Sequence, residues 1–423
     1  MGKFKYLSVA SPLLPDEERR TIVLEYETIL AHAGGSKFAA SCHEPGEPIV
    51  CFVMTGGTEA MILEHVNSCS VGAPDAPVFL LTYPGRNSLP AALEALARLQ
   101  QDGKFGRIFF LEGPDDRPGA ERLAAALKPV ASGNRDKVPA VRRTKPVGRL
   151  LDGKRIGLVG KPSDWLVASS PSPKSVTSIW GPEIVEIPMG ELESRIDGCS
   201  PESVTSFVDT FTNRAAQVLE PSGEDFVASG SIYTALRGLI DDLKLDAVSI
   251  RCFDLVVDRK ATGCLALSRL ADEGLVAGCE GDLPSAVAML WVQERLGQTS
   301  WMANPARVNV EANVLTLAHC TVPCSMLDGF KLRSHFESRL GAAIEGRMIA
   351  GPVTLLRIGA KALDDMWLAE GEIVSTGCEE TLCRTQVNVQ LHDLRVTELL
   401  DHPLGNHLVL TPGHVASELL DIT

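Results

Sequence analysis

Between Met1 and about Leu150, short apolar runs alternate with segments of helical patterning. The sequence PIVCFVMTGGTEAMILEHV is an apolar run, a glycine turn and a helical segment, and APVFLLTYPGRNSLPAALEALARLQQ and GRIFFLEGPDDRPGAERLAAAL repeat the form. Such alternation favours a parallel α/β sheet, in which helices connect the parallel strands. Because ligands of these sheets bind at the carboxyl ends of the strands, the loops Thr55–Thr58 and Gly85–Ser88 are the expected binding edge of a first domain.

The remainder of the chain divides into a second α/β region and a region of closely spaced strands. The second α/β region begins at the apolar run RIGLVG and includes a helix expected over Pro201–Leu219. From about Asn309, short strand-like runs are separated by Gly, Asn and Asp, which is typical of an antiparallel sheet or barrel. The predicted fold class is therefore α/β, with two parallel-sheet domains (1–152 and 153–305) and then a mostly antiparallel β-barrel domain (306–423). The basic segment 128–154, rich in Pro and Gly, is expected to link the first two domains.

The composition limits the class of protein and its partners. Of the 423 residues, 45% are apolar and 22% are charged, as in globular proteins with a large core. The formal net charge of −14 disfavours binding to nucleic acid or to an anionic membrane, and suits a small ligand or a metal ion. The eleven cysteines are scattered through apolar runs, as expected of reduced thiols, and no apolar run approaches the roughly 18 residues of a membrane-spanning helix. The predicted location is the cytoplasm.

The stretch CEGDLPSAVAMLWVQ places two carboxylates, Glu280 and Asp282, directly before an apolar segment that must be buried. Asp282 is predicted to cap a helix N-terminus, with Pro284 early in the first turn, where proline costs no hydrogen bond. Glu280 precedes the cap and has no such role. It is either an ordinary glutamate of a surface loop or a functional carboxylate at the open edge of the second sheet.

Two histidines lie at predicted strand ends in the C-terminal region, His319 in LAHC and His407 in GNHLVL. With Glu280 they would form an oxygen-and-nitrogen ligand set suited to a divalent transition metal with open positions. A lone histidine at a strand end is more often a hydrogen-bonded rim residue, and spacing alone does not decide between the two. The cysteine spacings in CTVPC and CEETLC also suggest zinc, but they are loose and no second tight pair completes a four-ligand site.

Five blocks of the sequence, in order, resemble the L-fucose isomerase and L-arabinose isomerase superfamily, especially its fucose-isomerase-like proteins of unassigned substrate: CEGDLPSAVAML, WMANP, LAHC, CRTQV and GNHLVL. The earlier blocks PGRNSLPAALEA and GKPSDWLVAS are similar as well, so the resemblance covers most of the chain. It implies two α/β domains, a C-terminal β-barrel and an active site at a subunit interface in a homo-oligomer, either a trimer or a hexamer. It also implies interconversion of aldoses and ketoses with Mn²⁺ or a similar divalent cation.

The resemblance implies roles for individual residues. Glu280 corresponds to a metal ligand and candidate base, His407 to the C-terminal ligand histidine, and His319 to a histidine near the metal in the arabinose branch. The second acidic ligand of the fucose branch falls on Asn304, and that of the arabinose branch one residue earlier. Asn304 is thus the expected further ligand and catalytic position, although an amide supplies neither negative charge nor a base. If Asn304 does not lie at the metal, Asp254 in RCFD is the alternative acid.

Further residues are expected to contact a sugar from loops near the site. Trp165 would either stack on a sugar ring or be buried at a strand–helix turn, and the polar residues of CRTQV would either line the site or support the barrel. The predicted substrate-binding residues are Arg86, Asn87, Ser163, Asp164, Trp165, Arg384 and Gln386.

The predicted function is metal-dependent aldose–ketose isomerisation of a sugar or sugar derivative through an enediolate. Removing a proton beside a carbonyl needs a positioned carboxylate and a Lewis acid on the neighbouring oxygens. A cation held by Glu280 and His407 would provide the Lewis acid, and Glu280 or an unidentified group would provide the base. One alternative is a related epimerase or lyase that uses the same enediolate. Another is a non-catalytic carbohydrate-binding or regulatory protein on the same fold. No nucleic-acid or membrane partner is expected, and the sequence does not identify the sugar.

Overall fold

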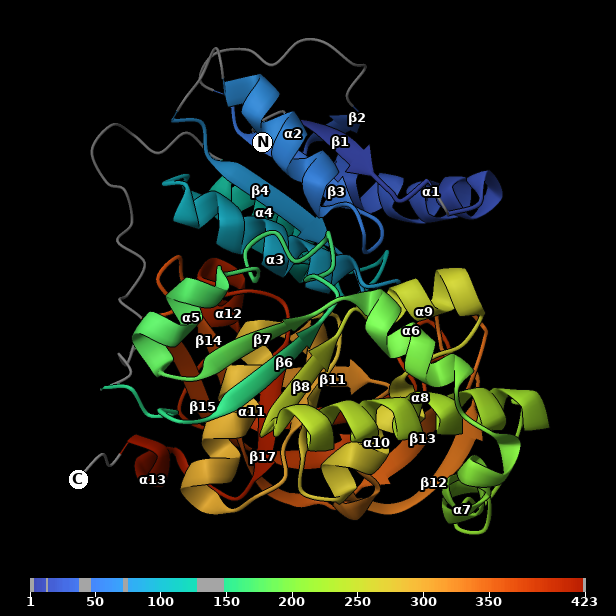
Figure 1. Ribbon diagram of the computed structural model, residues 1–423. Helices are drawn as coiled ribbons and strands as arrows, with labels where there is room; N and C mark the ends of the chain where they lie inside the picture. The colour runs from blue at the N-terminus through green and yellow to red at the C-terminus, as the bar shows by residue number, and fades with distance from the viewer. Residues whose placement is uncertain (1–3, 13, 38–46, 71–74, 128–147, 421–423) are drawn as a thin grey trace.

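The computed structural model describes residues 4–12, 14–37, 47–70, 75–127 and 148–420. These residues form two parallel sheets flanked by helices, a closed antiparallel barrel and a separate two-stranded sheet. Figure 1 shows the first sheet at the top of the molecule, and the second sheet below it and in front of the barrel. The predicted fold class, α/β with a C-terminal antiparallel barrel, is confirmed. None of the described helices is both long enough and apolar enough to cross a membrane.

The first sheet and its helices, which we call the N-terminal unit, have the strand order β2-β1-β3-β4-β5 with all pairs parallel. Its central strands β3 and β4 are buried along their whole length, because helices cover both faces of the sheet. The loops predicted as a binding edge follow β3 and β4 directly. The strands are β1 (Phe4–Val9), β2 (Gly35–Lys37), β3 (Ile49–Val53), β4 (Val78–Thr82) and β5 (Gly106–Phe110), and the helices are α1 (Asp16–His32), α2 (Glu59–Ser70), α3 (Ser88–Gln101) and α4 (Arg117–Ala126).

The second sheet and its helices form the middle unit, with the parallel strand order β7-β6-β8-β9. The strands are β6 (Arg155–Val159), β7 (Glu183–Ile187), β8 (Ala247–Ile250) and β9 (Val276–Gly278). The helices are α5 (Pro173–Trp180), α6 (Met189–Asp197), α7 (Pro201–Thr212), α8 (Gly223–Leu243), α9 (Cys252–Arg259), α10 (Cys264–Asp272) and α11 (Leu283–Leu296). The apolar helix α11 is buried from Leu283 to Val292 and contacts both this sheet and the barrel, so it joins the two.

The helix expected over Pro201–Leu219 ends earlier, at Thr212. Residues beyond it leave the helix because their backbone bonds to β12 instead. The N–H groups of Ala216 and Leu219 donate to the carbonyl oxygens of Phe330 and Leu332. A tertiary contact, which local helical patterning does not encode, therefore sets the end of α7.

The barrel closes through the strand order β10-β11-β16-β15-β14-β17, with β17 paired to β10. Its strands are β10 (Trp301–Asn309), β11 (Val314–His319), β14 (Gly351–Gly359), β15 (Asp365–Thr376), β16 (Thr385–Leu391) and β17 (Leu408–Pro412). Outside the barrel lie β12 (Leu327–Arg333), β13 (Ala343–Met348), the 3₁₀ turn Cys324–Met326, α12 (Val396–Asp401) and α13 (Ala416–Leu420). The two boundaries between the three predicted domains remain a prediction. Strand β10 crosses the position predicted for the second boundary, and most of the predicted linker, residues 128–147, lies outside the described residues.

Candidate active site

Glu280 stands in the turn between β9 and α11 with a backbone φ of 62°, a left-handed conformation that non-glycine residues seldom adopt. Two hydrogen bonds fix this turn. The carbonyl oxygen of Glu280 accepts from the N–H of Ser163 at 2.8 Å, and the N–H of Gly281 donates to the carbonyl oxygen of Ile250 at 2.9 Å. Gly281 also has a positive φ, and a Cβ there would lie only 2.7 Å from a carbonyl oxygen of the β6 loop. The sheet therefore holds Glu280 in one orientation, at the carboxyl ends of its strands.

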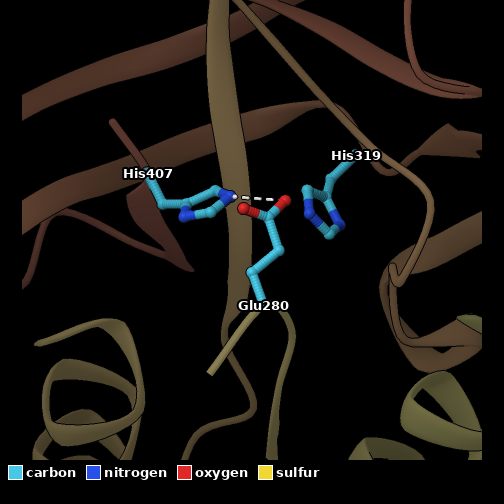
Figure 2. Close-up of side chains that lie close together, drawn as sticks. All are labelled: Glu280, His319 and His407. Carbon is cyan, nitrogen blue, oxygen red and sulfur yellow. Dashed lines mark ion pairs between the residues drawn. The ribbon is translucent and has the colours of Figure 1, made fainter. Parts of the chain in front are cut away.

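The barrel brings His319 and His407 to the Glu280 carboxylate, and it brings Asn304 to the pocket that Glu280 lines. His319 ends β11, Asn304 lies on β10 opposite Ala318, and His407 directly precedes β17. Ligand atoms of Glu280, His319 and His407 all lie within 4.8 Å of one another. Figure 2 shows the Glu280 carboxylate between the two imidazole rings, with the ion pair to His407 drawn. Within the described residues this is the one group of acidic, histidine and cysteine side chains with a spacing suited to a metal ion, and no cysteine belongs to it.

Asp282 caps helix α11 and also bonds to His407 in the cluster. The predicted cap is confirmed, because the carboxylate accepts from the N–H of Ser285 at 2.8 Å. The same carboxylate lies 2.9 Å from Nδ1 of His407 and accepts from Arg357 at 2.9 Å. A proton on Nδ1 that bonds to Asp282 leaves Nε2 of His407 facing Glu280 Oε1, 3.5 Å away. The carboxylate thus fixes which imidazole nitrogen faces the cluster.

Burial and close partners set the charges of the site. Burial would raise the pKa of Glu280, but His407 outweighs it and holds the pKa below its usual value. For Asp282, burial is outweighed mainly by Arg357, and its pKa is well below its usual value. Burial would lower the pKa of His407, yet Glu280 and Asp282 raise it to about 10. For His319, burial and the charge of His407 prevail, and its pKa falls to about 4. At neutral pH, His407 is therefore an imidazolium cation beside the carboxylates of Glu280 and Asp282, and His319 is neutral.

The donor atoms fit a divalent cation. Oδ1 of Asn304 is buried and has no hydrogen-bond partner among the described residues, and Nε2 of His407 is buried and has only its ion pair with Glu280 at 3.5 Å. Buried polar atoms usually have partners, so two of them beside a carboxylate and a neutral imidazole indicate a missing ligand. One carboxylate, two imidazoles and an amide oxygen suit a divalent transition metal, and such a cation would displace the proton of His407.

Two neighbours orient the other ligand atoms. The indole N–H of Trp165 donates to Oε2 of Glu280 at 2.5 Å, and its ring lies edge-on to Phe253 at 4.9 Å between centroids. Nδ1 of His319 lies 2.9 Å from the hydroxyl of Thr321, which leaves its Nε2 for another partner. Trp165, which was predicted to contact a sugar, therefore holds the Glu280 carboxylate in place.

A pocket of ≈ 450 Å³, its open mouth included, leads to this cluster. Its lining includes Glu280, Asn304 and His319 from the predicted site, and Asn87 from the predicted substrate-binding residues. The rest of its polar and thiol lining was not predicted and consists of Thr262, His335, Glu337, Cys252, Cys264, Cys279, Cys320 and Cys383.

The other predicted substrate-binding residues do not line this pocket, and they have structural partners instead. Arg86 pairs with Glu18, and Asp164 pairs with Arg251 at 2.8 Å. The backbone of Ser163 bonds to Glu280, as described above, and its hydroxyl is buried. The side chains from CRTQV are buried and hold loop backbone, donating to the carbonyl oxygens of Ser334 (from Arg384) and of Glu379 and Cys383 (from Gln386).

Sequence reasoning missed Arg357, His335 and Glu337. Arg357 lies within the apolar run GPVTLLRIGA, where a fully buried arginine signals a paired charge, and that signal was available. His335 and Glu337 lie in the loop between β12 and β13. The only sequence signal for them is a histidine two residues before a glutamate.

The chain is similar to several proteins named sulfoquinovose isomerase. It is 24% identical over 317 residues to that of Alkalicoccus urumqiensis, a match that covers 69% of this chain and 68% of the relative. It is 22% identical over 285 residues to those of Priestia aryabhattai and Priestia megaterium, with 65% of this chain and 63% of each relative covered. The chain thus matches a little under two thirds of the length of the two Priestia proteins. No family model matches the sequence.

Proposed function

We propose that this protein is an aldose–ketose isomerase of a sugar or sugar derivative, and that it uses a divalent cation, for which Mn²⁺ is our first choice. One observation carries the proposal: Glu280, His319 and His407 converge in a buried cluster, and Glu280 and His319 line a pocket together with Asn304, whose amide oxygen has no hydrogen-bond partner among the described residues. The similarity to three proteins named sulfoquinovose isomerase supports sugar isomerisation as the reaction class.

Glu280, His319, His407 and the Asn304 amide would hold the cation. When bound, it supplies a Lewis acid for the two neighbouring oxygens of a hydroxy-carbonyl sugar. The chain's own residues orient this set: Trp165 holds one oxygen of Glu280, and Asp282 holds His407 by Nδ1. The three ligand side chains are buried, and charge interactions are stronger away from bulk water.

The sugar itself is a separate matter. The relatives' printed name refers to sulfoquinovose, a hexose with a sulfonate at C6, which makes that sugar the first to test. The described residues that line the pocket include histidines but no lysine or arginine. A panel of neutral ketoses and aldoses therefore belongs beside it. The predicted homo-oligomer, trimer or hexamer, and the cytoplasmic location also remain part of this proposal.

The test combines metal content with proton exchange. Purified protein is analysed for Mn, Fe, Co and Zn, because two imidazoles and a carboxylate serve several of these ions. Glu280→Gln and His407→Ala are each expected to lose most of the bound metal and, with it, sugar-dependent deuterium incorporation in D2O. His414→Ala is the matched control, since that histidine bonds a backbone carbonyl outside the site. Normal metal content in both ligand variants would refute the proposal.

The product of exchange separates the alternatives. Deuterium at the carbon beside the carbonyl together with the isomeric sugar indicates an isomerase. Deuterium with an epimer or a cleaved product indicates an epimerase or lyase. Sugar binding without exchange indicates a carbohydrate-binding protein.

A further inference from the structure

The candidate site lacks an obvious proton carrier. If Glu280 binds the cation, its carboxylate is committed to that role, and Asn304 cannot take up a proton at neutral pH. Asp282 is fully buried and bonded to Arg357 and His407. Asp254, the alternative acid suggested by the sequence, pairs with Arg251 at 2.8 Å and does not line the pocket.

Glu337 is the one described carboxylate besides Glu280 in the lining of the pocket. It lies in the turn Phe336–Ser338, between β12 and β13. Glu337 is exposed, and it lines the pocket together with Glu280, Asn304 and His319. An accessible carboxylate in the same pocket as a candidate cation site is suited to general acid–base work.

The loop that carries Glu337 is held in place by its own hydrogen bonds. The N–H of His335 donates to the carbonyl oxygen of Leu340, and that of Arg339 donates to the carbonyl oxygen of His335, both at 2.9 Å. The ring of His335 also lies edge-on to Phe253, 5.7 Å between centroids, and the buried Phe336 anchors the turn. Such a closed loop presents its glutamate without a large ordering cost.

The N-terminal unit completes the arrangement. Asn87 precedes α3 with a left-handed backbone, and its amide donates to Oε1 of Glu337 at 2.6 Å. Asn87 lines the same pocket. One carboxylate oxygen of Glu337 is thereby held, and the other is left for a substrate.

We propose that Glu337 is the acid–base group that carries the proton between the two reacting carbons, and that Asn87 is its positioning residue; this rests on the function proposed above. In the aldose-to-ketose direction, a carboxylate oxygen of Glu337 forms an O–H bond as the C2–H bond breaks. That electron pair forms the C1=C2 bond, and the carbonyl pair moves onto O1. The hydroxyl proton of O2 passes to O1, and Glu337 returns its proton to C1. No oxidant or reductant is needed, and the carboxylate is regenerated.

Glu337→Gln tests the proposal in the full-length, metal-loaded protein. Deuterium incorporation into the best sugar of the panel is expected to fall about 100-fold or more, the usual contribution of a positioned acid–base group. Metal content and thermal stability are expected to stay as in the unmodified protein. This combination separates Glu337 from the ligands, because Glu280→Gln loses metal and exchange together.

Three further variants sharpen the result. Glu337→Asp is expected to recover part of the exchange, and Asn87→Ala to lower the maximal rate by a smaller factor without loss of metal. Glu372→Gln, an exposed glutamate of β15, is the matched control and should behave as the unmodified protein. Exchange in Glu337→Gln within threefold of the unmodified protein overturns the inference alone. A metal-loaded unmodified protein that exchanges no sugar proton overturns the proposed function and this inference with it.

Discussion

The N-terminal and middle units each bury two carboxylates near the centre of the molecule, yet the pKa values move in opposite directions. Glu59 and Glu94 in the first unit, and Glu280 and Asp282 in the second, are all at most 8% exposed. Burial raises the pKa of Glu59 to about 8 and also raises that of Glu94. The pKa values of the second pair lie below their usual range because His407 and Arg357 are adjacent.

The comparison separates burial from charge. Burial alone favours the neutral acid, and a carboxylate stays ionised only where a cationic partner offsets the lost hydration. The middle unit faces the barrel strands that supply Arg357 and His407, so its carboxylates remain anions. In the N-terminal unit, Glu59 has backbone donors only, and for Glu94 the charge of Arg357 lowers the pKa by less than burial raises it. Glu94, for example, accepts from the N–H groups of Ala168, Ser169 and Asn406 and so ties the three parts of the molecule together. The comparison therefore favours a cation site at the ionised carboxylates of the middle unit, Glu280 and Asp282.

The largest expected effect comes from removing the partner of Asp282. Arg357→Met would leave Asp282 buried with only His407 as a charged partner, and breaking such a pair costs about 3–5 kcal/mol. Urea unfolding at pH 7 measures the change. Arg347→Met is the matched control, because its pair with Asp328 is largely exposed and should contribute less than about 1 kcal/mol. Equal losses in the two variants would show that the buried pair contributes no more to stability than the exposed one.

A smaller change in stability, a gain and not a loss, is expected when Glu59 of the N-terminal unit is replaced. One oxygen of Glu59 has no hydrogen-bond partner among the described residues. Because its pKa in the folded protein lies above the unfolded value, the folded state binds the proton more tightly, and stability falls as the pH rises from about 4.5 to about 8. Glu59→Gln removes this loss. It should unfold like the unmodified protein at pH 4.5 and be more stable by about 1–3 kcal/mol at pH 8.5.

The comparison of urea unfolding at the two pH values includes Glu64→Gln, an exposed glutamate on the same helix, which should change little at either pH. A difference between Glu59→Gln and the unmodified protein that does not depend on pH would show that Glu59 remains charged in its buried position.

Local patterns predicted much of the fold and part of the site. Alternation of apolar runs with helical segments gave the parallel sheets, and Asp282 before Leu283-Pro284 gave the start of α11. The Glu280, His319 and His407 set followed from a family resemblance, because these residues lie in separate elements and spacing does not relate them. Arg357 and Glu337 were not predicted from the sequence. The position of Arg357 depends on how the barrel closes, and that of Glu337 depends on a loop outside the barrel. Asp282 was interpreted as a cap alone, because the contact with His407 joins residues 125 positions apart.

The smallest expected effect concerns Asn304. This amide stands at the position where the family resemblance implies a second acidic ligand. Asn304→Asp places a second carboxylate beside Glu280 without a matching cationic side chain, so the metal-free variant should be less stable than the unmodified protein. With Mn²⁺ the order should reverse, because a charged oxygen binds a hard divalent ion more tightly than an amide, by roughly tenfold or about 1.4 kcal/mol.

Thermal unfolding with and without Mn²⁺ measures both changes in stability, since a bound ion stabilises the folded state more the more tightly it binds. Asn388→Asp on β16 is the control, because the Asn388 side chain bonds two hydroxyl groups, and both hydroxyls can donate to a carboxylate. If Asn304→Asp responds to Mn²⁺ no more than this control, the Asn304 oxygen does not contact the ion, and the cation is held by Glu280 and the two histidines alone.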